Sequence, residues 1–301
     1  MVIMKYNKFT KLFIPPIVIF IRNKWLNFVY RKTSYLSTIG KISSSRDSLI
    51  VIGNGPSLTD SIRRFKDEIM AKDSIAVNSF CISDYYTEIK PQYYLLVDPA
   101  YFGDIDTYPD SLKKVVLDFK RSMIDKTSWD INLIVPDMAK NSWLLSEVRE
   151  NPSIHVYFFN MTNLVSVSSE KLKFKAWDNN LIAPPTQTCL NTCVWLGIFL
   201  RYKCIYLIGA DTSWIEQLHV DQETNEVYTI DSHFYGKKKQ LLYADVEGKV
   251  PKKLHEELNC ISRALSLYWE LKYYADYAGV KIFNLSKYSL IDAYERRKEI
   301  Y

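Results

Sequence analysis

Polar side chains stand at the ends of three apolar runs in this sequence. Asn78 lies in "VNSF", Asp98 in "VDPAYF" and Asp211 in "GADTSW". If these runs are parallel strands, the three side chains share the edge of the sheet at which such proteins bind their ligands. A single residue of this kind is typical of a helix cap, whereas three on one edge indicate a binding site. We expect the neighbouring Ser79 and Thr212 to belong to the same site.

His233 is the candidate general base. It lies in "DSHFYG", residues 231–236, among small and polar neighbours and not on an apolar face. A free histidine has a pKa of about 6.5, so its imidazole can accept a proton near neutral pH. The alternative interpretation is a surface histidine without a catalytic role. Tyr235, two residues further on, is a candidate donor-binding residue.

A turn rich in glycine, "GNGPS" at residues 53–57, is the candidate phosphate-binding segment. It is neither a G-x-G-x-x-G fingerprint nor a P-loop, because a leucine takes the place of the third glycine and no G-K-[ST] follows. Gly53 and Gly55 allow a close approach of the backbone, and Ser57 with Asp60 matches a capping box. The N–H groups at such a helix start favour phosphate. The alternative is a tight turn that holds no ligand.

Metal-binding patterns are weak in this sequence. Asp104 and Asp106 form a D-x-D pair, but no apolar run precedes it directly, and a turn is predicted. The stretch "HEELN" at 255–259 lacks the second histidine of a zinc helix. The five cysteines include no C-x-x-C. We therefore expect a reduced intracellular chain with neither a disulfide framework nor a zinc site.

Apolar runs alternate with helical patterns from residue 48 onward, and an apolar fraction of 48% is sufficient for a buried core. Strands are predicted at residues 48–53, 74–80, 92–98, 131–136, 154–159, 204–211 and 280–286. Helices are predicted at residues 57–70, 191–202 and 252–279. The alternation predicts a Rossmann-like α/β domain over residues 47–301, with a mostly parallel sheet and helices on both faces.

Residues 212–251 interrupt this alternation. They are polar and charged and show no clear hydrophobic periodicity. Long connections of this kind are usually functional. We expect an irregular insertion that acts as a lid over the carboxyl edge of the sheet.

Residues 1–46 form a basic head with nine Lys or Arg and no Asp or Glu, although the whole chain carries a net charge of only +5. Its apolar run, residues 12–21, would reach about 15 Å as a helix, half of the ~30 Å hydrocarbon core of a bilayer. We expect the head to lie on a membrane surface and not to span it. The alternative is that it packs on the body or on a second subunit of a homo-oligomer. No nucleic-acid-binding fold surrounds these cations, so no nucleic-acid partner is expected.

Several stretches in a fixed order resemble a known family. They are "VIGNGPSL", "DPAYF", "IYLIGAD", "SHFY" and, near the carboxyl end, "VKIFNLSKYSLIDAYER". Together, over residues 48–297, they resemble the family 42 bacterial sialyltransferases and a wider group that includes the flagellin motility accessory factors and polysaccharide-biosynthesis proteins.

The resemblance implies one catalytic domain that uses a nucleotide-activated sugar without a metal. Asn54 would contact the phosphate or ribose of the nucleotide, and Asn78 the nucleotide or sugar. Asp98 stands where those enzymes carry an asparagine near the donor sugar, and with Asp211 it is an acidic catalytic candidate. His233 matches their general base, which deprotonates the acceptor hydroxyl for direct displacement with inversion at the anomeric carbon.

The sequence also departs from the sialyltransferase pattern. The stretch "PPTQTCLNTC" has neither the arginine nor the Ser-Gly pair found before the buried helix of that family. "GADTSW" lacks their phosphate-binding tyrosine, which Tyr228 or Tyr235 would replace. The donor therefore stays open between a CMP-sugar, which the resemblance favours, and a UDP-sugar.

The resemblance and the basic head together predict a bacterial glycosyltransferase of surface polysaccharide biosynthesis, such as capsule or lipopolysaccharide. It would act on a glycan or lipid-linked acceptor at the inner face of the cytoplasmic membrane. One alternative is a pterin pyrophosphokinase-like enzyme, which would need Asp98, Asp104, Asp106 and Asp211 to cluster around a metal. The other is a carbohydrate-binding subunit without activity.

Overall fold

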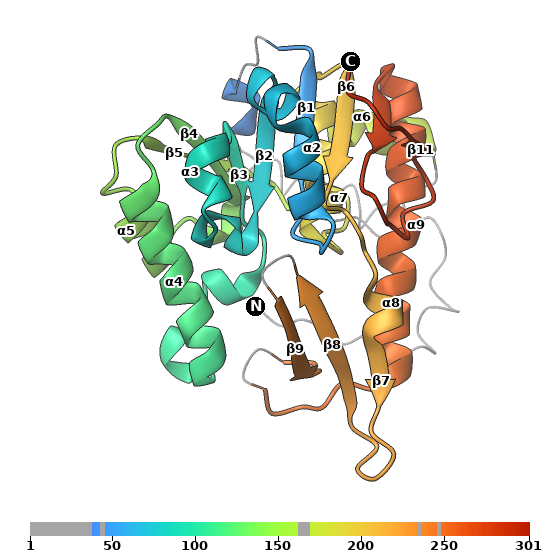
Figure 1. The fold of residues 1–301 in the computed structure, drawn as a ribbon. Helices are drawn as coiled ribbons and strands as arrows, with labels where there is room; N and C mark the ends of the chain where they lie inside the picture. Colours follow the sequence, from blue (N-terminus) through green and yellow to red (C-terminus); the bar gives the residue numbers. More distant parts are fainter. Residues whose placement is uncertain (1–37, 43–45, 162–168, 234–235, 246–247) are drawn as a thin grey trace, which may run out of the picture.

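The computed structural model describes residues 38–42, 46–161, 169–233, 236–245 and 248–301, with the backbone alone for residues 231–233 and 236–238. An eight-stranded sheet forms its centre (Figure 1). The strands lie in the order β11-β10-β6-β1-β2-β3-β4-β5, and every neighbouring pair is parallel. Their bounds are β1 Ser48–Ile52, β2 Asp73–Val77, β3 Tyr93–Leu95, β4 Ile131–Pro136, β5 Ile154–Phe159, β6 Cys204–Ile208, β10 Lys281–Asn284 and β11 Glu295–Arg296. The predicted Rossmann-like α/β fold is confirmed.

The order of the strands reverses between β1 and β6. The chain runs outward from β1 through β2, β3 and β4 to β5, and then returns to the other side of β1 with β6. Two neighbouring strands whose connections leave in opposite directions leave a crevice outside their carboxyl ends. The topology therefore places the expected ligand site after β1 and β6.

Helices cover both faces of the sheet. On one face lie α2 (Leu58–Ala71), α3 (Tyr85–Ile89), α4 (Asp110–Lys126) and α5 (Trp143–Val148), and on the other α6 (Glu170–Asp178), α7 (Cys189–Phe199) and α9 (Leu254–Ala278). Alternate residues of β1 enter the two cores: Leu49 and Val51 pack with α7 and α9, and Ile50 and Ile52 with α2. This two-sided burial explains why the strand is a continuous apolar run and not an alternating one.

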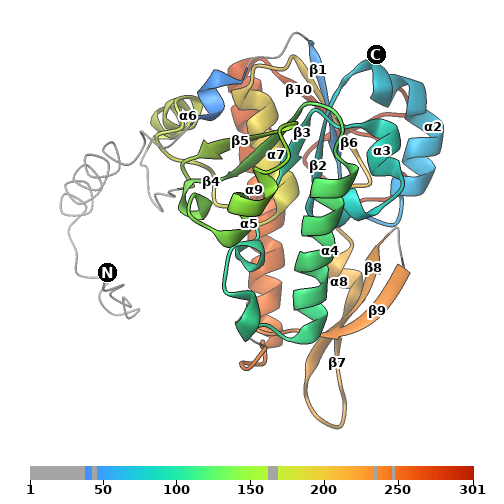
Figure 2. The ribbon, with the colours of Figure 1, turned by 90° about the vertical axis from the view of Figure 1, so that its left-hand side faces the viewer.

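The connection after β6 was expected to be irregular, and this expectation is wrong. It forms α8 (Trp214–Gln217) and an antiparallel sheet of β7 (Leu218–Val220), β8 (Val227–His233) and β9 (Gly236–Leu241). The hairpin between β7 and β8 is closed by Asp221, whose carboxylate accepts the N–H groups of Glu223 and Thr224, both at 3.0 Å. The small sheet lies beyond the carboxyl edge of the main sheet in both views (Figures 1 and 2).

Part of the predicted head belongs to the folded body. Ile39, in the short 3-10 helix η3 (Ile39–Lys41), is fully buried in the core. Thr38 continues the edge of the sheet, because its N–H donates to Phe158 O at 2.7 Å and its hydroxyl accepts the Phe158 N–H at 2.9 Å. Residues 1–37, which carry most of the predicted membrane-binding segment, lie outside the described part. Within the described residues, no helix combines the length and apolarity that a membrane crossing requires.

Candidate functional site

A cavity of about 610 Å³ opens at the carboxyl edge of the sheet, where the strand order reverses. The turns after β1, β2 and β6 form one wall, the start of α7 forms another, and α8, β8, β9 and the first half of α9 close the site from the opposite side. Six residues that the sequence proposed line this cavity: Asn54, Gly55, Asn78, Ser79, Asp211 and Thr212. Segments that lie far apart in the chain therefore meet at one site, which we call the main cavity.

Gly53 and Gly55 bring the turn after β1 into contact with the end of β6. A Cβ on Gly53 would lie 2.5 Å from Gly209 O, and a Cβ on Gly55 would lie 2.1 Å from Asp211 Oδ2. The close approach is held by backbone hydrogen bonds, since Gly55 N donates to Gly209 O at 2.8 Å. The space beside Gly53 and Gly55 is thus filled by the backbone after β6 and by the Asp211 carboxylate.

The predicted capping box of Ser57 and Asp60 is wrong. Asp211, at the far end of β6, accepts the Ser57 N–H at 3.2 Å and the Ser57 hydroxyl at 2.7 Å. Asp60 instead forms an ion pair with Lys287 at 3.1 Å. A protein carboxylate therefore occupies the helix start at which the sequence predicted a phosphate, and its charge opposes the binding of a second anion there.

Asp211 is buried, with 4% of its surface exposed. Burial raises the pKa of its carboxyl group above the usual value, while the hydrogen bonds from the Ser57 side chain and backbone lower it, and burial prevails. Ionisation of this carboxyl group is consequently unfavourable, and the hydrogen bonds from Ser57, at the start of α2, stabilise the charged form. Its hydrogen bonds link α2 to β6 and make Asp211 a positioning residue for the turn.

Two residues of the cavity wall have left-handed backbone conformations. Asn78, which follows β2, has φ 48°, and Thr212, which follows β6, has φ 52°. For residues other than glycine this conformation costs roughly 1–2 kcal/mol. Such strain persists where the surrounding structure fixes it, and it is concentrated at binding sites. Both residues lie at the carboxyl edge of the sheet and border the same cavity.

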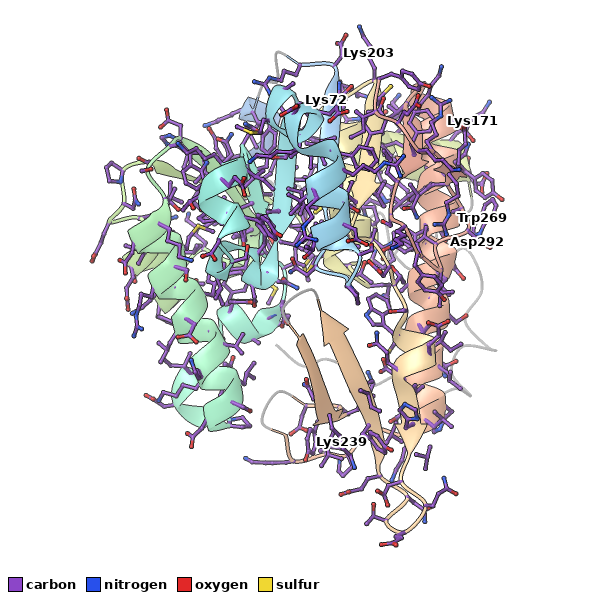
Figure 3. All side chains as sticks on the ribbon, in the orientation of Figure 1. Lys72, Lys171, Lys203, Lys239, Trp269 and Asp292 are labelled. Atoms are coloured by element: carbon purple, nitrogen blue, oxygen red, sulfur yellow. The ribbon has the colours of Figure 1, made fainter. Side chains whose placement is uncertain are left out.

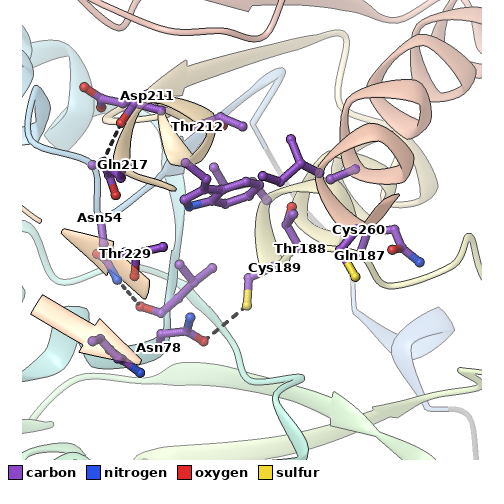
Figure 4. Close-up of a pocket in the computed structure, with 18 of the residues that line it drawn as sticks. Asn54, Asn78, Gln187, Thr188, Cys189, Asp211, Thr212, Gln217, Thr229 and Cys260 are labelled. Carbon is purple, nitrogen blue, oxygen red and sulfur yellow. Dashed lines mark hydrogen bonds between the residues drawn. The ribbon is translucent and has the colours of Figure 1, made fainter. Parts of the chain in front are cut away.

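Hydrogen bonds fix the polar side chains on the β1 and β2 side. Asn54 Nδ2 donates to Val77 O at 3.1 Å, and the Cys189 thiol donates to Asn78 Oδ1 at 3.2 Å (Figure 4). Burial raises the pKa of Cys189 to about 12, so the thiol is protonated and acts as a donor. Figure 4 shows Thr188 beside Cys189, facing the same space as Asn78.

The start of α7 is part of the site that sequence reasoning missed. Thr188, Cys189 and Leu190 line the cavity. The Thr188 hydroxyl caps the helix by accepting the Asn191 N–H at 3.1 Å. The first N–H groups of a helix have no partner within it and carry the positive end of its dipole, so this edge of the cavity attracts anions. A threonine before an apolar helix is a recognisable start signal.

The wall opposite the main sheet is also polar, and it too was missed. Thr229 and Gln240 face each other across β8 and β9, and both line the cavity. Lys252 and Glu257 form an ion pair in the wall where α9 begins. Burial is the largest single influence and lowers the pKa of Lys252, but Glu257 and Cys260 together raise it by more, so the amine keeps its positive charge.

Three other predicted residues, Asp98, Gly53 and Ser57, are not among the described residues that line the cavity. Asp98 is exposed and caps the 3-10 helix η5 (Pro99–Tyr101), accepting the Ala100 N–H at 2.9 Å. Gly53 and Ser57 lie behind the wall. His233 is the last residue of β8 and stands opposite Gly236 in β9. The His233 side chain, and Tyr235 entirely, lie outside the described part of the chain.

The carboxylates that a phosphoryl-transfer site would need do not gather. Asp98 caps η5, Asp104 caps η6 (Ile105–Thr107) in the predicted turn, Asp106 pairs with Lys113 at 2.7 Å, and Asp211 contacts Ser57. In the part of the chain that the structure describes, no three His, Cys, Asp or Glu side chains are grouped as metal ligands would be.

Comparison with protein-family models gives no match, and no curated protein matches the sequence. Among solved structures, the chain is similar to the MAf glycosyltransferase from Magnetospirillum magneticum AMB-1, with 13% sequence identity and a TM-score of 0.44. The match covers 85% of this chain and 34% of that one, so the chain spans about a third of the length of the solved protein.

Proposed function

We propose that this protein is a glycosyltransferase that binds a nucleotide-activated sugar in the main cavity. The observation that carries the proposal is the cavity itself, at the point where the strand order reverses, lined by amide and hydroxyl side chains. Its volume of about 610 Å³ lies within the range of about 300–1,000 Å³ that is usual for small-molecule sites. The strained Asn78 and Thr212 give this edge the rigid backbone geometry that a specific site requires.

The donor phosphate is proposed to bind at the start of α7 and not at the start of α2. Asp211 already fills the α2 position and would repel an anion. The α7 start carries no acidic residue in its first turn, and the Lys252 amine stands in the same cavity. Asn54 and Asn78 then lie where an amide can contact the ribose or the base, while Ser79 offers a hydroxyl from the same edge.

His233 is proposed as the general base that deprotonates the acceptor hydroxyl, with inversion at the anomeric carbon. It lies four residues beyond Thr229 in β8, and an even spacing is that of positions on one face of a strand. The motif "SHFY" supports the same role through its resemblance to the family 42 enzymes. Tyr235 remains a predicted donor contact.

The donor class proposed first is a CMP-sugar, with a UDP-sugar as the second choice, and no metal cofactor is invoked. The acceptor is a glycan or lipid-linked saccharide of a bacterial surface polysaccharide. A peripheral location on the inner face of the cytoplasmic membrane is proposed from the charge of residues 1–46. Association into a homo-oligomer is part of the same proposal.

The test separates catalysis from binding with a matched pair of histidine variants. His233→Ala should lower transfer by about 10²–10⁴-fold and leave the donor dissociation constant unchanged, as expected for the loss of a general base. His219→Ala is the control, because His219 stands on the neighbouring strand β7 and stacks on Tyr228 at 5.3 Å. It should retain turnover. Equal turnover of His233→Ala and wild type would remove the assigned role.

A further inference from the structure

A second hollow of about 610 Å³ lies beside α2 and does not belong to the main cavity. It is bounded by one side of α2, the residues that follow β10 and the residues that follow β11. Five cations border it: Arg64, Lys287, Arg296, Arg297 and Lys298. We call this hollow the basic groove.

The positive charge of the basic groove is only partly compensated. Asp60 is the one acid among the described residues of its lining and pairs with Lys287 at 3.1 Å. Arg297 pairs with Glu295, outside the lining, at 2.8 Å. Among the described residues, no carboxylate forms an ion pair with the other three cations. Two of them contact neutral carbonyls instead: Arg64 donates to Lys298 O at 2.8 Å, and Arg296 donates to carbonyls of the 286–289 turn.

These contacts orient the guanidinium groups without neutralising them. Arg64 lies over the Phe65 ring, with its central carbon 5.0 Å from the ring centroid, and Arg297 lies over Phe283 at 3.9 Å. Stacking of this kind reduces the freedom of a long side chain. Because a fixed guanidinium loses less entropy when it binds, the groove is prepared for an anion whose oxygens match the planar fork, and phosphate is such an anion.

The groove adjoins the main cavity through shared structure. Its strand, β10, pairs with β6, which ends at the main cavity. Ser286, in the groove lining, accepts the Ala210 N–H at 2.8 Å through its hydroxyl, one residue before Asp211. Because β6 and β10 are parallel neighbours, about 4.8 Å apart, the residues after them place the main cavity and the basic groove on adjacent parts of the carboxyl edge.

We propose that the basic groove binds a diphosphate group carried by the acceptor and holds the acceptor sugar toward the main cavity. This inference rests on the proposed glycosyl transfer and adds the chemical class of the acceptor: a saccharide linked through a diphosphate. A diphosphate offers enough oxygens for two guanidinium forks, and its charge complements the excess of cations in the groove.

The first experiment measures binding of inorganic pyrophosphate by titration calorimetry, with the main cavity saturated by the donor nucleotide. The variant Arg64→Glu/Lys298→Glu should bind pyrophosphate at least tenfold more weakly, because it replaces two attractive charges by two repulsive ones. The control Lys171→Glu/Lys281→Glu has the same change of charge. Lys171 lies on α6 (Figure 3) and Lys281 starts β10, and both are exposed and outside the groove lining. It should bind within twofold of wild type. Equal loss in both variants, or none in either, overturns the proposal.

The second experiment compares transfer to two acceptors with the same sugar, one with and one without the diphosphate. The groove variant should raise KM at least tenfold for the diphosphate acceptor, keep its kcat, and leave the neutral acceptor unchanged. If the reversed charges prevent folding, the neutral variant Arg64→Gln/Lys298→Gln, with a smaller change in charge, should shift KM in the same direction. Loss of binding to anionic phospholipid vesicles, with an unchanged KM for the diphosphate acceptor, would assign the groove to a membrane surface and refute the acceptor role.

Failure of this inference and failure of the proposed function give different results. If the protein binds a nucleotide sugar but the groove substitutions do not change its affinity for pyrophosphate, the proposed function stands and the groove assignment is refuted. If the protein binds pyrophosphate in the groove but binds no nucleotide sugar in the main cavity, the glycosyltransferase assignment is refuted.

Discussion

Removing the contact between Ser57 and Asp211 should show that the two residues stabilise the site as one unit. The perturbation is a double-mutant cycle of Ser57→Ala, Asp211→Ala and the double variant. Asp211 accepts two hydrogen bonds from Ser57, at 3.2 Å from the backbone and 2.7 Å from the hydroxyl, and both residues are buried. Hydrogen bonds to charged groups contribute about 1.5–3 kcal/mol, and a buried partner left unpaired adds a desolvation cost of similar size.

The expected magnitudes follow from which partner is left behind. Ser57→Ala should lower the free energy of unfolding by about 1.5 kcal/mol, because Asp211 keeps the backbone N–H. Asp211→Ala should lower it by about 3 kcal/mol, since it leaves both the N–H and the hydroxyl of Ser57 without their acceptor. The double variant should also lose only about 3 kcal/mol, so the coupling is about 1.5 kcal/mol. Urea unfolding at pH 7, followed by circular dichroism, measures each value. Losses that add to within about 0.5 kcal/mol would refute the linkage.

The same pair predicts a dependence of stability on pH. In the unfolded chain Asp211 ionises near its usual pKa of about 3.8, and in the folded chain burial raises that pKa. Between the two values the folded chain holds a proton that the unfolded chain has lost, so this group makes stability fall as pH rises through the window. Asp211→Asn carries no titrating group and should lose that part of the slope. An identical slope in the variant would contradict the assigned cause.

Three further predictions concern the turn, the thiol and the head. Gly55→Ala should lower the free energy of unfolding, measured in urea, by about 2–3 kcal/mol and displace Asp211, because its Cβ would lie 2.1 Å from the carboxylate. The control Gly40→Ala, whose Cβ would have nothing within 4 Å, should change that free energy by less than about 0.5 kcal/mol. Cys189, whose pKa is about 12, should react with iodoacetamide at pH 8 roughly a thousandfold more slowly than a free cysteine, as read by mass spectrometry of its peptide; reaction at the free rate would show an ionised thiol. Deletion of residues 1–37 leaves the buried Ile39 in place. The shortened protein should no longer sediment with anionic vesicles and should keep its activity on a soluble acceptor. Unchanged sedimentation would place the membrane contact elsewhere.

The fold was predictable from the sequence because the central strands β1, β2 and β3 are fully buried. β1 and β6 are short, mostly apolar runs that are followed by glycine, and such runs separated by helical patterns leave few other architectures. α7 was recognisable as a buried helix because Val194, Trp195 and Leu196, which are all fully buried, leave no polar face. The long helix α9 was marked at its end by Gly279, which has the left-handed conformation typical of that position, φ 74°.

The antiparallel sheet of the insertion was missed for a physical reason. β9 contains three consecutive lysines, Lys237 to Lys239, so its sequence gives no alternation of polar and apolar residues. β8 carries the strand-forming "VYTI", but an isolated run of that length does not show what it pairs with. The strands that pair with β8 are determined by the hairpin at Asp221, which joins β7 to β8, and by the rest of the fold around the small sheet.

The sequence predicted which residues of the candidate site lie at the carboxyl edge of the sheet, but it did not predict the contacts that they make. The sequence places Asn78 and Asp211 after strands, and parallel pairing then brings them to one edge. No local pattern could show that Asp211 would reach Ser57, because the two lie 154 positions apart in the chain. For the same reason the wall made by Thr188 and Lys252 became visible only once the topology had placed α7 and α9 beside the cavity.

Binding of a nucleotide sugar in the main cavity is the central claim, and a thermal-unfolding titration with CMP-, UDP- and GDP-sugars tests it most directly. One of these donors should raise the melting temperature of the wild type by an amount that grows with its concentration over Kd. Thr229→Trp, which fills the cavity from β8, should abolish that shift, whereas Thr224→Trp, on the exposed hairpin turn, should preserve it. Stabilisation that survives in Thr229→Trp, or no stabilisation by any nucleotide sugar, would contradict the account.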